Sequence, residues 1–291
     1  MKSGFVNIIG NPNVGKSTLM NALVGERLSV ITAKSQTTRH RIFGIVNGDD
    51  YQIVYSDTPG LIKPAYKLQD AMVKAARSAL SDADILLYIT DVLETSDKNA
   101  DILEIVKKTK VPLLLIINKI DLSNQQEVEA LVLKWQEIFP KAEIFPSSAL
   151  LKFNLDNLFN RILELLPEAP PYFDRDQLTD RPERFFVTEI IRGAILETYQ
   201  KEVPYAVEPV VEEFKESEDI IRIRTVIYVE RDSQKGILIG HKGSALKQVG
   251  ILARKDLETF FEKKIFIELF VKVAKDWRNR PDMLKSFGYE I

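Results

Sequence analysis

The stretch Gly10-Asn11-Pro12-Asn13-Val14-Gly15-Lys16-Ser17 decides the fold of the first half of the chain. It matches the phosphate-loop pattern, in which a glycine-rich turn connects a strand to the start of a helix. The glycines let the backbone wrap around an anion, while backbone amides and the helix N-terminus supply partial positive charge. The stretch predicts a nucleotide-binding loop in which Lys16 reaches the β- and γ-phosphates and the Ser17 hydroxyl binds Mg²⁺.

Around this loop, apolar runs typical of strands alternate with helical patterns. The expected strands are Phe5–Gly10, Ile53–Ser56, Ile85–Asp91, Leu113–Asn118 and Glu143–Ser147, and the expected helices are Lys67–Leu80, Asp97–Lys108, Asn124–Phe139 and Asp156–Leu166. This alternation predicts an α/β fold, a mostly parallel sheet with helices on both sides. Arg41–Val46 is expected to add an antiparallel edge strand that turns at Asn47–Gly48.

A second polar motif, Asn118-Lys119-Ile120-Asp121, follows an apolar strand and therefore lies at the carboxyl edge of the sheet, where ligands of such folds bind. A carboxylate there accepts hydrogen bonds from N1–H and the 2-amino group of guanine, and adenine lacks that second donor. A site built around such a partner discriminates strongly against the wrong base. The stretch Ser147-Ser148-Ala149 is expected to add a backbone amide to the guanine 6-oxo group. Together these residues predict a guanine nucleotide.

Two further loops are expected around the phosphates. Asp57-Thr58-Pro59-Gly60 closes a strand, which places Asp57 to hold Mg²⁺ through water and the Gly60 amide to contact the γ-phosphate. In the polar stretch from residue 32 to residue 40, Thr38 is the candidate for a hydroxyl that closes on Mg²⁺ and the γ-phosphate. Thr37 is the alternative, and spacing does not separate the two. Lys16, Thr38 and Gly60 are thus the expected catalytic residues.

The pattern changes beyond residue 170. Residues 171–183 are rich in proline and charge, and we expect them to link a first domain, 1–170, to a second, 184–291. The second domain is expected to begin with a helix, Arg184–Gln200. Its expected strands are Ala206–Lys215, Ile220–Glu230 and Lys264–Val273. We expect Glu189, Arg192 and Glu197 to form an exposed face of its first helix.

Between two helices of the second domain lies Gly240-His241-Lys242-Gly243, a GxxG turn that lets a sugar-phosphate backbone approach closely while Lys242 supplies charge. Lys272, Lys275 and Arg278 follow the last strand and are candidates to hold phosphates, whereas a solvated tail is the simpler interpretation. Trp277 either stacks on a base or anchors the end of the chain. The element order resembles a type II KH fold, which binds about four unpaired nucleotides beside this loop.

Composition excludes several classes of site. The chain of 291 residues has no cysteine and two histidines, which excludes disulfides, thiolate metal sites and cysteine nucleophiles. Its apolar runs are far shorter than the ~20 residues that span a bilayer, and no signal peptide is recognised, so we expect a cytoplasmic protein. The net charge of −2 hides a split: residues 171–230 carry −6 and residues 231–285 carry +6. The GxxG turn lies in the basic block, which favours a polyanion partner.

These motifs in this order resemble a translation-factor-related GTPase over residues 4–166. Relatives often carry a catalytic glutamine where this chain has Leu61, and the subgroup with an apolar residue there implies slow intrinsic turnover, limited by positioning. Asn13 resembles a residue of potassium-stimulated relatives whose side-chain carbonyl helps bind K⁺ beside the phosphates. A structural role for Asn13 within its own loop is an equal alternative. Equal hydrolysis rates in K⁺ and Na⁺ buffers would contradict the K⁺ hypothesis.

A phosphate-loop domain followed by a KH domain resembles the bacterial Era GTPase family over essentially the whole chain, including the ending Val271–Arg278. That resemblance implies a monomeric switch that binds small-subunit ribosomal RNA near its 3′ end, assists assembly of that subunit and has a peripheral inner-membrane fraction. GTP and Mg²⁺ are expected to order the loops of Thr38 and Asp57 and to reorient the KH domain about Phe173–Pro182. The alternative is a GTPase whose second domain docks a protein. A role as a GTPase subunit in RNA modification ranks lower, and an ATP-driven helicase lower still.

Overall fold

The computed structural model describes residues 1–94 and 100–291, and contacts divide the chain into two compact units. Unit 1 comprises residues 1–29, 38–63 and 72–180, and unit 2 comprises residues 30–37, 64–71 and 181–291. The first three residues of the expected helix Asp97–Lys108 lie outside the described residues. In the described ranges no helix is both long and apolar enough to cross a lipid bilayer.

Unit 1 is built on a six-stranded sheet, and the expected α/β architecture is confirmed. Its strands are β1 (Lys2–Gly10), β2 (Ile42–Asn47), β3 (Tyr51–Asp57), β4 (Ile85–Asp91), β5 (Leu113–Asn118) and β6 (Glu143–Pro146). They lie in the order β2-β3-β1-β4-β5-β6, and every neighbouring pair is parallel except the edge pair β2–β3. Strand β4 is buried along its whole length, as expected of a strand covered on both faces.

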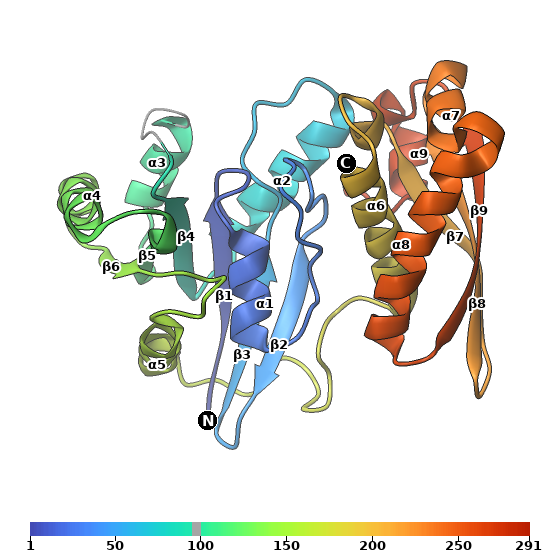
Figure 1. Ribbon diagram of the computed structural model, residues 1–291. Coiled ribbons are helices and arrows are strands. Elements are labelled where there is room, and N and C mark those ends of the chain that lie inside the picture. Colours follow the sequence, from blue (N-terminus) through green and yellow to red (C-terminus); the bar gives the residue numbers. More distant parts are fainter. Residues whose placement is uncertain (95–99) are drawn as a thin grey trace. The chain divides into compact units, whose positions relative to one another are not determined.

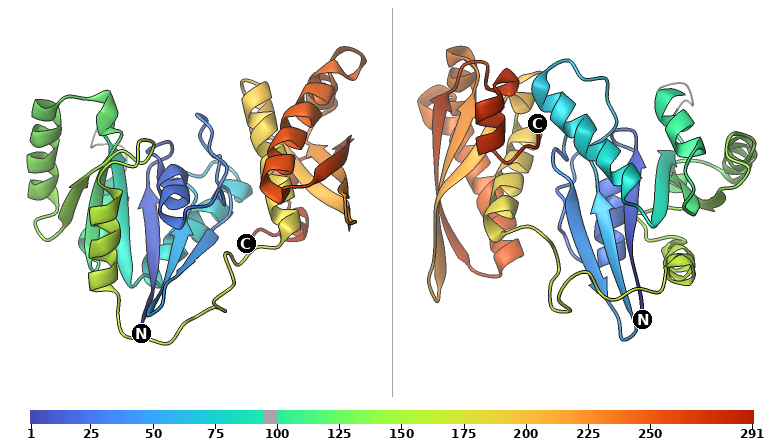
Figure 2. Two further views of the ribbon diagram at one scale, coloured as in Figure 1. Left: turned by 60° about the horizontal axis from the view of Figure 1, so that its bottom comes forward. Right: turned by 180° about the vertical axis from the view of Figure 1, so that it is seen from behind.

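Helices cover both faces of this sheet. They are α1 (Lys16–Val24), α2 (Lys67–Ser81, whose first turn clusters with unit 2), α3 (Ala100–Lys107), α4 (Gln125–Ile138) and α5 (Leu155–Leu165). Figures 1 and 2 show α1 on one face of the sheet and α2 on the other. The parallel strands therefore end together at one edge, where the loops after β1, β3, β5 and β6 meet.

The segment after α5 runs along the open edge of unit 1. The buried Gln52 side chain accepts from the amides of Tyr172 (2.7 Å) and Phe173 (3.0 Å) and donates to the Phe173 carbonyl (2.8 Å). On the edge strand β2, the Ile45 amide donates to the Leu178 carbonyl at 2.8 Å. These bonds cover an otherwise unpaired strand edge. Residues 171–180 of the expected linker therefore belong to unit 1, and α6 begins at residue 183.

Unit 2 places three helices on one face of a three-stranded sheet. In chain order it contains α6 (Glu183–Thr198), β7 (Glu208–Glu216), β8 (Ile220–Val229), α7 (Asp232–Ile239), α8 (Ser244–Phe261), β9 (Lys264–Val273) and α9 (Pro281–Ser286). Strands β7 and β8 are antiparallel, whereas β8 and β9 are parallel. The core joins side chains of α6, α7 and α8 to the inner face of the sheet, including Ile191, Leu238, Leu257 and Ile227. This order and pairing are those of a type II KH domain.

Candidate functional site

The phosphate loop leaves β1 at Gly10 and enters α1 at Lys16, as the motif predicts. Its bends require left-handed backbone at Asn13 (φ 66°) and Gly15 (φ 100°). Gly15 is also crowded, since a Cβ there would lie 2.2 Å from Nδ2 of Asn118. Glycine at this position therefore permits both the backbone turn and the close approach of the Asn118 side chain.

Lys16 is buried beneath this loop. Its Nζ donates to the Asn11 carbonyl at 2.7 Å, and only 6% of the residue is exposed. Burial lowers the pKa of Lys16 to about 8, against the opposing attraction of the Asp57 and Glu94 carboxylates. The phosphates of a bound nucleotide would favour the charged form of Lys16.

We expect nucleotide binding to take up protons near pH 8. Bound phosphates raise the pKa of Lys16, so proton uptake per GDP bound should increase by about half a proton between pH 7.5 and pH 8.5. By the same linkage, GDP affinity should fall as the pH rises above 8. Isothermal titration calorimetry in buffers of different ionisation enthalpy measures this uptake, and a value independent of pH would contradict the expectation.

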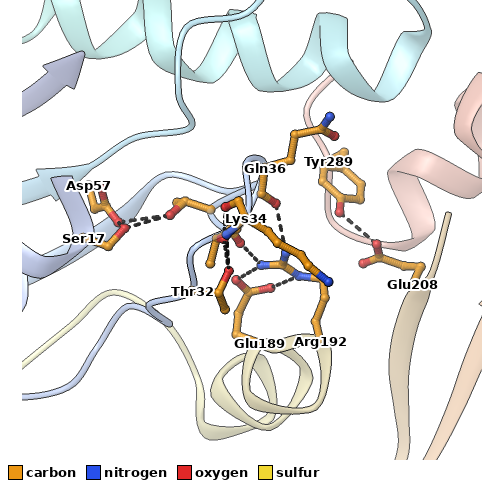
Figure 3. A network of polar contacts seen from close by, with 11 residues as sticks. Ser17, Thr32, Lys34, Gln36, Asp57, Glu189, Arg192, Glu208 and Tyr289 are labelled. Carbon is orange, nitrogen blue, oxygen red and sulfur yellow. Dashed lines mark hydrogen bonds and ion pairs between the residues drawn. The ribbon is translucent and has the colours of Figure 1, made fainter. Parts of the chain in front are cut away.

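Three oxygen-bearing side chains of the candidate metal site converge. The Ser17 hydroxyl donates to Oδ2 of Asp57 at 2.7 Å, and Thr38 Oγ1 lies 3.0 Å from Ser17 Oγ and 3.3 Å from the same Oδ2. Figure 3 shows Ser17 and Asp57 facing each other. Thr38 rather than Thr37 reaches this cluster, because the Thr37 hydroxyl donates to the Lys34 carbonyl. The ambiguity left by spacing is therefore resolved by geometry.

This cluster fits a hard divalent cation. Burial raises the pKa of Asp57, which the hydroxyl of Ser17 and the charge of Lys16 oppose, and its buried Oδ1 has no hydrogen-bond partner among the residues that the structure describes. A carboxylate oxygen left unsatisfied beside two hydroxyls is a suitable donor set for Mg²⁺. When bound, Mg²⁺ would neutralise phosphate charge, held by Ser17, Thr38 and Asp57.

In the loop after β3, some residues bond to the protein itself and others lie beside the phosphate loop. The Thr58 hydroxyl donates to the Ile8 carbonyl at 2.7 Å, so this predicted nucleotide contact ties β3 to β1. Gly60 lies against the phosphate loop, where a Cβ would come within 2.8 Å of Pro12. The following Leu61 is 4% exposed, and its amide donates to the Gly10 carbonyl at 3.3 Å. An apolar, buried Leu61 has no group that could orient water.

Asn118 joins three loops of the site. Its Nδ2 donates to the Val14 carbonyl at 2.8 Å, and its Oδ1 accepts from the Ala149 amide at 2.9 Å. Next to it, Lys119 Nζ donates to the Asn13 carbonyl and forms an ion pair with Asp91, both at 2.6 Å. These two side chains hold the phosphate loop against Asp91 at the end of β4 and against Ala149 in the loop after β6, and their contact with the nucleotide stays a prediction.

The remaining candidate base contacts surround this point. Asp121 is exposed in the short turn after β5, with its carboxylate available to solvent. The amides of Ser147 and Ser148 donate to the carbonyls of Ile117 (2.8 Å) and Phe153 (3.3 Å). Both amides of the serine pair are thus engaged within the protein, so a contact from this loop to guanine stays a prediction.

Sequence reasoning missed two acidic residues here. The carboxylate of Glu94 accepts hydrogen bonds from the side-chain amide of Asn11 and from the Thr90 hydroxyl, the latter at 2.7 Å. Asp91 forms an ion pair with Lys119. Asp91 is the last residue of β4, and Glu94 follows three residues later. Their position at the carboxyl end of a buried strand could have identified them as candidate site residues from the sequence. A cleft of about 640 Å³ lies beside the loop, lined by Asn11, Pro12, Asn13, Val14, Leu61, Lys63, Asp91, Leu93, Glu94 and Lys119.

In unit 2 the GxxG turn opens a groove. Gly240 (φ 72°) and Gly243 (φ 80°) take left-handed backbone, and His241 and Lys242 are exposed between them. A groove of about 340 Å³ runs between α8 and β9, lined by Gly243, Leu246, Lys247, Gly250, Ile251, Arg254, Ile267 and Leu269. Its apolar floor and its two cations suit bases and phosphates of a single strand.

The basic residues after β9 do not act as one set. Arg278 pairs with Glu230, and its guanidinium lies 4.5 Å from the ring centroid of Tyr66, so it is engaged within unit 2 and its contact with RNA stays a prediction. Lys272 pairs with Glu212 at 3.2 Å, and Lys275 is exposed. Trp277 is fully buried and donates to the Ala206 carbonyl at 3.0 Å. The tryptophan therefore anchors the chain end and is not available to stack on a base.

Comparison with known proteins agrees with a GTPase domain followed by a KH domain. Residues 5–119 match the family described as 50S ribosome-binding GTPase, and residues 202–278 match the KH domain. A relative from Staphylococcus epidermidis, GTPase Era, is 43% identical over 290 residues, covering 99% of this chain and 97% of that protein. The chain belongs to the GTPase Era family.

Solved structures of Era share the whole fold. One is Era in complex with MgGDPNP and nucleotides 1506–1542 of 16S ribosomal RNA, and another is a variant of Aquifex aeolicus Era bound to GDP and AlF₄⁻. Each matches with a TM-score of 0.95 and 38% identity, and the match covers 100% of both chains. As a member of this family the protein is a GTPase, and unit 1 carries its nucleotide site.

Proposed function

We infer that this GTPase binds the 3′ region of small-subunit ribosomal RNA through unit 2 and assists assembly of the small subunit. The observation that carries the proposal is the groove between α8 and β9, which opens directly beside the exposed turn of His241 and Lys242. The Era complex with nucleotides 1506–1542 of 16S ribosomal RNA supports the choice of ligand. The basic residues Lys247 and Arg254 on the groove are suited to its phosphates.

Substitution at the GxxG turn tests this proposal. A Cβ at Gly243 meets nothing within 4 Å, so Gly243→Asp adds a negative charge at the groove without a clash. We expect affinity for an RNA of nucleotides 1506–1542 to fall at least about tenfold because the carboxylate repels phosphate. Filter binding at several salt concentrations measures both the affinity and its salt slope.

Gly288→Asp is the matched control. Gly288 also lies in unit 2 with positive φ (85°) and open surroundings, so it carries the same backbone strain and the same added charge away from the residues that line the groove. RNA binding by this variant should stay within about twofold of the parent. If Gly243→Asp binds RNA as tightly as Gly288→Asp, the groove is not the RNA site, and the alternative of a protein partner is favoured.

We further propose that GTP and RNA binding are coupled. Residues 30–37, which directly precede Thr38, and residues 64–71, which follow the loop of Asp57 and Gly60, cluster with unit 2, so the chain itself connects the loops of the nucleotide site to the RNA-binding unit. Coupling of this kind is reciprocal: if GTP raises RNA affinity by some factor, RNA raises GTP affinity by the same factor. Equal RNA affinity with a GTP analogue, with GDP and without nucleotide would refute it.

The ions and the location complete the proposal. Mg²⁺ is assigned to Ser17, Thr38 and Asp57, supported by the unsatisfied Asp57 Oδ1 and by the MgGDPNP of the Era complex. A K⁺ ion near Asn13 rests on resemblance alone, and hydrolysis in K⁺ and Na⁺ buffers tests it. From the family resemblance we also propose that the protein is a monomer, which light scattering tests. We propose in addition that it is cytoplasmic with a peripheral inner-membrane fraction, which cell fractionation tests.

A further inference from the structure

An ion pair on α6 is buried where the sequence pattern predicted an exposed helix face. Glu189 is 3% exposed and Arg192 is 1% exposed, so the prediction for these two residues is wrong. They lie one helical turn apart and pair directly, and Arg192 Nε also donates to Glu189 Oε1 at 3.0 Å. A buried pair of this kind contributes little net stability unless further hydrogen bonds satisfy it. The further hydrogen bonds of Arg192 therefore show what this ion pair holds in place.

Those partners are backbone carbonyls of the segment 30–37. Arg192 donates from Nη1 to the Gln36 carbonyl at 3.2 Å and from Nη2 to the Thr37 carbonyl, so its planar guanidinium reaches two successive peptide groups. Figure 3 shows Arg192 between Glu189 and Gln36. Glu189 fixes the guanidinium from the other side. Arginine suits this task because its fork of donors is rigid.

The same segment contacts α6 at two further points. A Cβ on Gly193 would lie 2.7 Å from Cγ1 of Val30, so the absence of a side chain at Gly193 makes room for the first residue of the segment. The ammonium of Lys34 donates to the Tyr199 carbonyl just after the helix. The segment 30–37 is thus held on α6 at its start, its middle and its end.

The residue after this segment is Thr38. Its hydroxyl lies within 3.3 Å of both Ser17 and Asp57, the other two candidate Mg²⁺ ligands. Since the carbonyl that Arg192 holds belongs to the peptide bond between Thr37 and Thr38, fixing that carbonyl restricts the backbone that aims the Thr38 hydroxyl. In this arrangement the Arg192 contacts and the Thr38 contacts are formed together.

We propose that Arg192, oriented by Glu189, is a positioning residue for GTP hydrolysis: it holds the peptide before Thr38 so that the Thr38 hydroxyl stays at the metal and γ-phosphate site. This inference rests on the role proposed for Thr38. Arg192 and Thr37 both belong to unit 2, and Thr38, the next residue along the chain, belongs to unit 1.

The test replaces the ion pair by apolar side chains of similar length, Glu189→Met with Arg192→Met. Without the guanidinium, the preference for a non-hydrolysable GTP analogue over GDP should fall at least about tenfold, since charge-assisted hydrogen bonds are lost from the GTP arrangement. The rate constant for hydrolysis at saturating Mg²⁺-GTP should fall by a similar factor. GDP affinity should stay within twofold, because Thr38 acts on the γ-phosphate. Because both substitutions lie in unit 2, thermal unfolding followed by circular dichroism, and not GDP affinity alone, reports whether that unit is folded.

Three comparisons make the result specific. Arg161→Met with Glu164→Met removes an exposed ion pair of the same spacing on α5 (2.6 Å), together with the pair between Arg161 and Glu143 (2.7 Å), and should leave the analogue preference unchanged. Arg192→Lys keeps the charge and one donor direction and should recover part of the preference. Gly193→Ala displaces Val30 while favouring the helix, so it should lower the preference even if the double methionine variant does not fold.

Thr38→Ala distinguishes the positioning role of Arg192 from the role proposed for Thr38 at the metal and γ-phosphate. If Thr38→Ala leaves the analogue preference unchanged, the role of Thr38 is wrong. If Thr38→Ala lowers the preference but neither the methionine variant nor Gly193→Ala does, the positioning role of Arg192 is refuted while that of Thr38 stands. If Arg192 acts through Thr38, adding the methionine pair to Thr38→Ala should have no further effect on the preference.

Discussion

Gly15→Ala is expected to lower GDP affinity at least about 100-fold. An added Cβ would lie 2.2 Å from Asn118 Nδ2, so either Asn118 leaves the Val14 carbonyl and the Ala149 amide or the phosphate loop moves. Both outcomes disconnect the phosphate loop from the loop after β6. Left-handed backbone costs alanine a further ~1–2 kcal/mol. Titration with fluorescent GDP measures the affinity, and thermal unfolding measures the stability.

Gly25→Ala is the matched control for this substitution. Gly25 ends α1 with φ 86°, close to the 100° of Gly15, yet a Cβ there meets nothing within 4 Å. It should lower the melting temperature by a few degrees, as a cost of about 1 kcal/mol does, and leave GDP affinity within twofold. If the two variants bind GDP equally well, the packing of Gly15 against Asn118 does not control the site.

Asp121→Asn is expected to change the base preference of the nucleotide site from guanine to xanthine. The carboxylate of Asp121 is expected to accept from two donors on the edge of guanine, whereas an amide can donate to the 2-oxo group that xanthine carries there. GDP affinity should fall at least about 100-fold, and affinity for xanthosine diphosphate should rise above it, because an unmatched hydrogen-bonding edge is strongly penalised. Competition between the two diphosphates against one fluorescent nucleotide gives both affinities.

Asp156→Asn is the control for charge. Asp156 is an exposed aspartate in the first turn of α5, so its substitution removes the same charge from unit 1. Its preference for GDP should equal that of the parent. Retention of the guanine preference by Asp121→Asn would show that Asp121 does not read the base.

Where local chemistry decides the structure, the sequence was enough. The turn from Gly10 to Ser17 depends on glycines at fixed positions between a strand and a helix, and periodicity placed β4, β5 and β9 close to their observed bounds. The alternation of these elements predicted the sheet, and the sheet places Asn118 and Asp57 at the same edge. The GxxG turn was found in the same way.

Contacts between residues distant in sequence were decided by the tertiary structure alone. Helical spacing placed Arg192 and Glu189 on a charged face, but spacing cannot show that the segment 30–37 covers that face and supplies carbonyls to a guanidinium. In the same way, the motif that contains Asn118 does not show that its side chain bonds to the Val14 carbonyl and the Ala149 amide. A side chain's local pattern fixes its direction from the backbone, whereas burial and hydrogen-bond partners depend on what the rest of the chain brings to it.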